Sequence, residues 1–444
     1  MRIGFGRRDI TPRVGVELCG FGPFLNRHSI GVRDRLWARA VAFEAGRERV
    51  VLVSCDLVGV KPPTTNRVRA LVQEATGIGP QAVMVHCTHT HSGPNTDRVY
   101  GWGDPDLPYL ETLPQRIAAA CVDAVGNLTE ATLSHAEVPC TGIALNRERD
   151  RDAPPLEEVL QENWQPTHPE WTDTTCHVFR ADAGDRLLGF LSNYGCHPVT
   201  CCQQTRYIHG DFVGVATNLL EREHEGAVGL FLQGAQGDIN SCVVHKPEQE
   251  SLLALDVIAG RYARAVRRGL VEAKPLQVDE VRAVTHRVTF SRRDLDLAGL
   301  RKWLAEKEAI LHAPGASDTN GEVRMAAVYV TTLRELIARA EAGLPLNAPT
   351  ELQGFRLGSV ALLGAPFEIF REIKQEILGK ARLPITVVLG LTNDALGYAP
   401  DRETAARGGY AAEQVPIMKG DLPFTDIHGE LVRELLALDA ALAG

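Results

Sequence analysis

Two histidines that follow an apolar segment are the first residues in this chain with the chemistry to bind a metal ion or move a proton. His89 and His91 stand in the run THTHSGP, directly after the strand-like segment 81–88. Because side chains alternate along extended backbone, both imidazoles are expected to point the same way and His86 the opposite way. Folds that combine strands and helices place their sites at such strand ends. The pattern therefore predicts a site here, with a pair of surface loop histidines as the alternative.

A third histidine, His197, follows the apolar segment 186–193 in the run NYGCHP. A lone histidine at a strand end is usually a hydrogen-bonded loop residue, so a metal role for His197 depends on further ligands. Three cysteines lie beside it, at Cys196, Cys201 and Cys202. They lack the paired CxxC spacing of a structural zinc site, which favours buried or reactive thiols.

The segments that must position these residues alternate between strand and helix patterns. Strand patterns occupy 35–45, 49–57, 81–88, 130–138, 174–182, 186–193, 227–233, 276–290, 351–364 and 385–391. Helix patterns occupy 63–76, 107–126, 211–224, 251–272, 296–312, 322–342, 367–380 and 426–442. This alternation predicts the α/β class, with mixed sheets and flanking helices.

Two local signals refine that prediction. The pair Gly184-Asp185 stands between two strand patterns, which predicts a hairpin at this point. No repeat or linker interrupts the chain, so we expect one domain over residues 1–444 with a helical excursion at about 295–345.

Composition narrows the class of partner. The net charge of −9 argues against a nucleic-acid surface, which needs a basic stripe. No stretch approaches the roughly 20 apolar residues of a membrane span, and MRIGFGRRDITP has no apolar core of a secretory signal. The ten cysteines are scattered, which favours reduced thiols and a cytoplasmic location. We expect a small-molecule substrate, no membrane insertion and a possible homo-oligomer.

The motifs and their order resemble the catalytic domain of the neutral (alkaline, non-lysosomal) ceramidase family. They are spread over nearly the whole chain, and THTHSGP is the most specific of them. The others are DITP (9–12), VLVSCDL, Asn146-Arg147, CHP (196–198), Gly237-Asp238, Pro366-Phe367-Glu368 and two late tyrosines. The resemblance implies a neutral-ceramidase-like catalytic domain.

The resemblance also implies a zinc site. Carried over by motif, the four ligands are His89, His197, Glu368 and Tyr398. Nitrogen and oxygen donors suit zinc, and this set leaves room for a water molecule. Without the resemblance, Glu368 would be taken for an acid at a helix N-terminus and Tyr398 for a core tyrosine.

Three further residues match active-site positions of the family: His91, Arg147 and Tyr410. They would move a proton or stabilise a tetrahedral anion, while zinc acidifies its bound water and polarises the scissile carbonyl. One departure is that Asn240 stands where ceramidases carry a serine needed for activity, and Ser241 comes one residue late. The family's C-terminal immunoglobulin-like domain also has no counterpart here. Both departures leave the zinc chemistry intact and put ceramide in doubt as the substrate.

These features predict a zinc-dependent hydrolase that cleaves an amide (N-acyl) or ester bond of a soluble substrate with a metal-activated water. An esterase or lactonase could use the same site. A different class, a non-haem iron oxidoreductase, could use the His/His/Glu set. The phenolic ligand and the absence of an HxD pair count against iron. A binding protein without activity is the remaining alternative.

Overall fold

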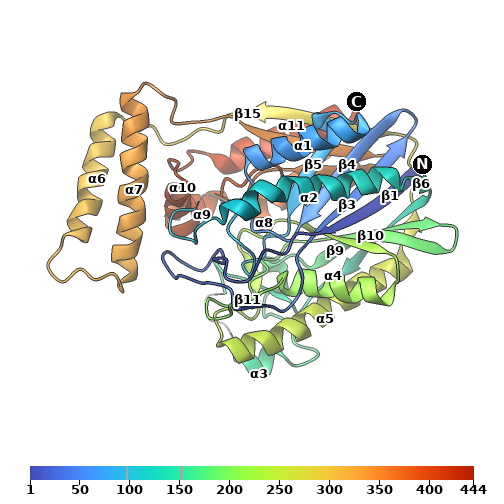
Figure 1. Ribbon diagram of the computed structural model, residues 1–444, viewed down its shortest axis with the longest axis horizontal. Coiled ribbons are helices and arrows are strands. Elements are labelled where there is room, and N and C mark those ends of the chain that lie inside the picture. Colours follow the sequence, from blue (N-terminus) through green and yellow to red (C-terminus); the bar gives the residue numbers. More distant parts are fainter. Residues whose placement is uncertain (97–98, 151–153) are drawn as a thin grey trace.

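The computed structural model describes residues 1–96, 99–150 and 154–444. Its first sheet has the strand order β5-β4-β3-β1-β6, in which β4 and β5 are parallel and the other pairs antiparallel. The strands are β1 (Arg2–Asp9), β3 (Trp37–Ala45), β4 (Glu48–Cys55), β5 (Val83–Cys87) and β6 (Thr129–Glu130). Helices α1 (Pro62–Thr76) and α2 (Leu107–Gly126) cover one face of this sheet (Figure 1).

A second sheet has the order β12-β10-β9-β7-β14, with β10 and β12 parallel. Its strands are β7 (Thr132–Pro139), β9 (Thr175–Ala183), β10 (Arg186–Tyr194), β12 (Val228–Gln233) and β14 (Lys274–Pro275). Helices α4 (Asp211–Glu223) and α5 (Glu248–Glu272) pack on its outer face. Strands β9 and β10 form the predicted hairpin, and Gly184 takes the left-handed φ of 60° that its turn requires.

The alternation of side chains explains how these two sheets pack. On β3, the small residues Ala38, Ala40 and Ala42 lie against the helices, whereas Val41 and Phe43 face the second sheet. Because successive side chains point to opposite faces, each strand supplies both layers of core. The result is two sheets face to face, each covered by helices on its outer side.

A third sheet completes the body, in the order β15-β16-β17-β19. It consists of β15 (Val281–Val288), β16 (Thr350–Leu357), β17 (Val360–Gly364) and β19 (Ile385–Leu389), and it packs with α8 (Arg371–Leu378) and α11 (Ile427–Ala443). The shorter elements are β2 (Gly31–Val32), β8 (Ala144–Asn146), β11 (Tyr207–Ile208), β13 (Ile239–Ser241), β18 (Glu368–Ile369), β20 (Tyr398–Ala399), α3 (Leu156–Val159), α9 (Arg402–Arg407), α10 (Val415–Met418) and a π-helical turn (Tyr410–Gln414).

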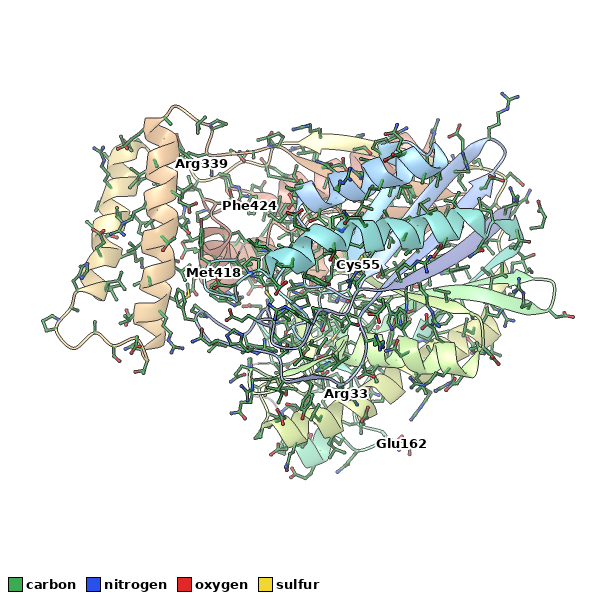
Figure 2. All side chains as sticks on the ribbon, in the orientation of Figure 1. Arg33, Cys55, Glu162, Arg339, Met418 and Phe424 are labelled. Atoms are coloured by element: carbon green, nitrogen blue, oxygen red, sulfur yellow. The ribbon has the colours of Figure 1, made fainter. Side chains whose placement is uncertain are left out.

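The expected helical excursion is a hairpin of α6 (Leu297–Leu311) and α7 (Gly321–Glu341) that projects from the body (Figure 1). The middle of α7 is joined to the body by a hydrogen bond of 2.6 Å from the Thr332 hydroxyl to the carbonyl of Ile417. Met418, labelled in Figure 2, packs with Val328 of α7 in one apolar cluster. The hairpin is therefore anchored to the segment that follows Tyr410.

One predicted boundary is wrong. The helix expected at 367–380 begins only at Arg371, and Glu368 lies in strand β18 instead. The reason is tertiary, because β18 pairs in parallel with β20, a partner far along the chain.

Two further observations concern the chain as described. None of its helices combines the length and the apolar character needed to cross a membrane. All ten cysteines are buried, and none of them forms a disulfide bond.

Candidate metal centre

The four side chains predicted as ligands converge at one point. The Nε2 atom of His197 lies 2.9 Å from Oε2 of Glu368, and Nε2 of His89 lies 3.3 Å from the same oxygen. The hydroxyl of Tyr398 lies 3.4 Å from Nε2 of His197. The structure thus brings together residues from four separate segments.

His89 occupies a strained turn directly after β5. Its φ of 72° is left-handed, which is uncommon for a residue with a side chain. Its backbone N–H donates to the carbonyl of Leu57 at 2.8 Å, and its Nδ1 lies 2.6 Å from the carbonyl of Val58. Strain of this kind persists where surrounding contacts enforce it, commonly at functional sites.

The expected reason for the joint orientation of His89 and His91 is therefore wrong, although both rings face the site. The backbone at His89 is not extended, so simple alternation does not apply there. The two Nε2 atoms nevertheless lie 3.2 Å apart, brought together by the turn. His86 points away into the core, where its Nε2 accepts the backbone N–H of Gln233 at 2.7 Å.

His197 is held by the same kind of contact as His89. Its Nδ1 lies 2.6 Å from the carbonyl of Gln236, and its backbone N–H donates to Ile239. A carbonyl oxygen can only accept, so Nδ1 carries the proton in both rings and each Nε2 keeps a lone pair. Burial lowers the pKa of His197 to about 4, so this ring is neutral at pH 7.

Glu368 and Tyr398 face each other across the short parallel pair β18 and β20. Burial raises the pKa of Glu368, but His89 and His197 outweigh it and hold that pKa well below its usual value. Burial raises the pKa of the Tyr398 hydroxyl well above its usual value. The guanidinium of Arg147 stacks on the Tyr398 ring, 4.8 Å from its centre.

This donor set fits a metal ion. When both rings are neutral, the two Nε2 lone pairs and the Glu368 oxygen point at one another, an arrangement that is repulsive unless a proton or a metal cation lies among them. The donors are those that zinc takes, and hydrogen bonds from Nδ1 to backbone carbonyls are typical of metal-binding histidines. The geometry also offers a different set, because the ligand atoms of His89, His91 and His197 lie within 4.8 Å of one another.

The predicted catalytic residues surround the centre. A cavity of about 400 Å³ is lined by His91, Arg147, Asn240 and Tyr410 together with His197 and Tyr398. Arg147 donates from Nη2 to the carbonyl of Gly237 at 2.6 Å. Burial, followed by the neighbouring His89 and His197, holds the pKa of His91 well below its usual value. All eight predicted site residues therefore meet at one cavity or its floor.

The side chains of Asn240 and Ser241, the two residues at or next to the family's serine position, point in different directions. Asn240 lies in β13 and lines the cavity. The hydroxyl of Ser241 is buried and accepts a hydrogen bond of 3.0 Å from Thr200. Ser241 therefore does not take the place of the missing serine.

Several cavity walls were not predicted. They are Phe21, Trp102, His245, Met325 and Met418. Phe21 has a left-handed φ of 70°, and its ring meets His91 edge-on at 5.2 Å between ring centres. The neighbouring Gly20 is the local feature of the sequence that marks this wall. The structure explains the glycine, because a Cβ there would lie 2.4 Å from Nδ1 of His91. Met325 gave no signal, because it reaches the site only through the position of α7.

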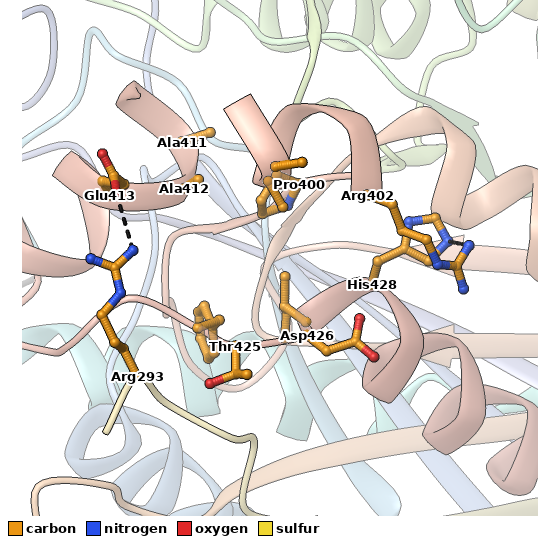
Figure 3. A pocket seen from close by; sticks show the side chains of 13 residues that line it. Arg293, Pro400, Arg402, Ala411, Ala412, Glu413, Thr425, Asp426 and His428 are labelled. Atoms are coloured by element: carbon orange, nitrogen blue, oxygen red, sulfur yellow. Dashed lines mark hydrogen bonds and ion pairs between the residues drawn. The ribbon is translucent and has the colours of Figure 1, made fainter. Parts of the chain in front are cut away.

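A second cavity, of about 440 Å³, is lined by Ala411, Ala412 and Glu413, which follow Tyr410 in the chain (Figure 3). The π-helical turn presents Tyr410 and Gln414 to the first cavity, and Ala412 and Glu413 to the second. Arg293 contacts Glu413 there at 3.1 Å between Nη2 and Oε1. This contact joins the π-helical turn to the segment between β15 and α6.

Asp238, from the Gly237-Asp238 motif, makes stability depend on pH. It accepts hydrogen bonds of 2.8 Å from Asn146 and from the backbone of Arg371, and burial raises its pKa to about 6. Unfolded aspartate titrates near about 3.9, so between these values only the folded protein keeps the proton. The free energy of unfolding should therefore fall as pH rises through this window, by about 3 kcal/mol in total.

Asp238→Asn is expected to flatten this decline. Denaturant unfolding of the metal-free protein at pH 4, 5, 6 and 7 measures it, with the exposed turn variant Asp185→Asn as control. A decline that persists unchanged in Asp238→Asn would show that another group is responsible.

The sequence of this chain is similar to those of known proteins. The profile of the family described as "Neutral/alkaline non-lysosomal ceramidase, N-terminal" matches residues 1–250. The neutral ceramidases of Drosophila melanogaster and Drosophila pseudoobscura pseudoobscura are each 26% identical over 259 residues, covering 54% of this chain and 36% of those proteins. The match thus spans about a third of the length of these curated relatives.

Solved structures match the fold over almost the whole chain. A crystal structure of neutral ceramidase from Pseudomonas aeruginosa has a TM-score of 0.73 at 20% identity, covering 99% of this chain and 75% of that one. A structure described as a ceramidase complexed with C2 has a TM-score of 0.76 at 18% identity, with 100% and 75% covered. The predicted α/β class with mixed sheets and flanking helices is confirmed.

Proposed function

The chain belongs to the neutral/alkaline non-lysosomal ceramidase family, and from that premise we propose that it is a zinc-dependent hydrolase of amide or ester bonds. The observation that supports this best is the convergence of His89, His197, Glu368 and Tyr398. Two of these residues lie outside the segment that the family profile matches, yet they complete the donor set.

The residues of this chain divide into holding and reacting groups. His89, His197, Glu368 and Tyr398 would hold zinc, which when bound supplies a Lewis acid that polarises a carbonyl and acidifies water. The neutral imidazole of His91 faces the cavity and is placed to accept a proton or to hydrogen-bond the reacting oxygen. The Arg147 guanidinium and the Tyr410 hydroxyl are donors that can stabilise a developing oxyanion.

The cavity indicates the size and charge of the substrate. At about 400 Å³ it lies at the lower end of the range for pockets that hold drug-sized molecules. Its walls include the apolar side chains of Phe21, Trp102 and Met325, and Arg147 is the one charged lysine, arginine, aspartate or glutamate among the described lining residues. A neutral or anionic acyl compound of moderate size fits these walls. An ester or lactone meets the same requirements as an amide.

Metal analysis and a substrate screen test the proposal. We expect the purified protein to contain one zinc per chain, to lose activity with a chelator and to recover it with zinc. N-acyl, ester and lactone compounds should be screened with the zinc-loaded protein. Stoichiometric iron, or a zinc-loaded protein inactive on all three classes, would contradict the proposal; iron would favour the oxidoreductase alternative.

Long-chain ceramide should be hydrolysed weakly or not at all. Asn240 replaces the family's serine at the cavity wall, and a cavity of about 400 Å³ cannot enclose two long alkyl chains. Turnover of long-chain ceramide in detergent micelles, compared with the best substrate of the screen, measures this. Equal rates on both would refute it. Asn240→Ser need not restore activity, because the cavity of about 400 Å³ would remain too small for two long alkyl chains.

A further inference from the structure

A turn at the start of α4 lies beneath both loops that carry the metal-binding histidines. It consists of His209, Gly210 and Asp211, all buried. The backbone of His209 connects to the first loop in both directions. Its N–H donates to the carbonyl of Ser92 at 3.1 Å, and its carbonyl accepts from the Thr90 hydroxyl at 2.9 Å. The turn therefore holds the residues on both sides of His91, next to His89.

The carboxylate of Asp211 connects to the second loop. It accepts the backbone N–H groups of Thr200 at 3.2 Å and Cys201 at 3.3 Å, which follow His197, and that of Phe212 at 2.7 Å. The side chain is 1% exposed, and no cation lies within ion-pair distance among the described residues. A buried carboxylate without a cation is costly, and its position at the N-terminus of a 13-residue helix offsets part of that cost.

The turn is packed so that it cannot shift easily. Asp211 has a left-handed φ of 51°, and its own N–H donates to Nδ1 of His209 at 3.0 Å. A Cβ on Gly210 would lie 2.9 Å from the Cα of Gly214. A strained residue held on all sides is a rigid support for what it contacts.

These contacts exclude a second metal site here. Ligand atoms of Cys201, His209 and Asp211 lie within 4.8 Å of one another, which resembles a metal cluster. However, Nδ1 of His209 already accepts a backbone N–H, so the neutral ring carries its proton on Nε2 and has no free lone pair. Three backbone N–H groups likewise occupy the Asp211 carboxylate.

We propose that His209 and Asp211 are positioning residues that fix the separation of His89 and His197, whose ring centres lie 5.1 Å apart. One residue holds each loop, and the tight turn joins the two. This inference rests on the proposed metal site. Outer groups that orient metal ligands typically contribute a factor of about 10 to 100 in metal affinity.

Asp211→Asn tests the proposal on the full chain. The amide keeps one acceptor oxygen and loses the other, so we expect zinc binding, measured by chelator competition, to weaken about 10- to 100-fold. The absorption spectrum of the cobalt-substituted protein should change as well, because it reports ligand geometry. The control is Asp439→Asn in α11, a fully buried aspartate that accepts the backbone N–H of Arg382 at 2.7 Å. It should bind zinc with wild-type affinity.

Thr90→Val gives an independent test, since it removes at nearly constant volume the hydroxyl that donates to the carbonyl of His209 and accepts the N–H of Ser92 at 3.1 Å. It should also weaken zinc binding, and it decides the matter if Asp211→Asn does not fold. Wild-type zinc affinity and an unchanged cobalt spectrum in a folded Asp211→Asn or in Thr90→Val would overturn the proposal. A wild-type protein that binds no zinc would refute the proposed function instead.

Discussion

Replacing His89 by alanine is expected to abolish zinc binding and hydrolysis together. The change removes a donor nitrogen that lies 3.3 Å from Glu368. Only three of the four predicted ligands then remain around the ion. Zinc stoichiometry after dialysis and turnover of the best substrate should therefore fall in parallel, to background. The metal-free variant should stay folded, because the His89 ring contributes polar contacts rather than apolar core.

The matched control for this change is His245→Ala. His245 lines the same cavity, and its Nδ1 lies 3.3 Å from Gln203 rather than near the donor set. We expect it to keep one zinc per chain. If His89→Ala retains zinc at wild-type stoichiometry, His89 is not a ligand and the centre has been assigned wrongly.

Replacing His91 by alanine is expected to leave zinc bound and to slow turnover by about 10²- to 10⁴-fold, the range for loss of a general acid or base. The Nε2 atom of His91 faces the site, 3.2 Å from Nε2 of His89, and the ring borders the cavity, whereas Nδ1 is buried beside Gly20. A neutral imidazole in this position suits proton transfer through Nε2. Zinc content and kcat, measured beside His89→Ala, separate the two roles.

This pair of variants also distinguishes the two ligand sets that the geometry permits. If zinc is held by His89, His91 and His197, then His91→Ala loses the metal as His89→Ala does. If zinc is lost only in His91→Ala, the roles of the two histidines are reversed. If neither change affects turnover, the active site lies elsewhere.

The positions of the strands and helices could be predicted well from local patterns. Helix α1 begins within one residue of its predicted start and ends at the predicted residue, and the hairpin across Gly184 is present. Such patterns show which face of a segment carries the apolar side chains, and this periodicity is a property of the segment itself. The start of the helix after Glu368 was wrong because strand pairing with β20 competes there with helix formation.

The site was predictable in its residues and not in its geometry. The run THTHSGP and the CHP motif identify His89 and His197, but extended backbone at His89 was the wrong conformation. The left-handed turn depends on the carbonyls of Leu57 and Val58, which accept its N–H groups from another loop.

By itself, the sequence determined the α/β class, the order of the segments and the identity of the residues with metal-binding chemistry, because periodicity and motifs are local. Tertiary structure alone decided that Glu368 and Tyr398 are strand neighbours and that Phe21 and Met325 close the cavity. It also decided that Asp211 supports the loop of His197. These contacts join segments whose approach depends on turn conformations and packing between layers, and no single segment carries that information in its own pattern.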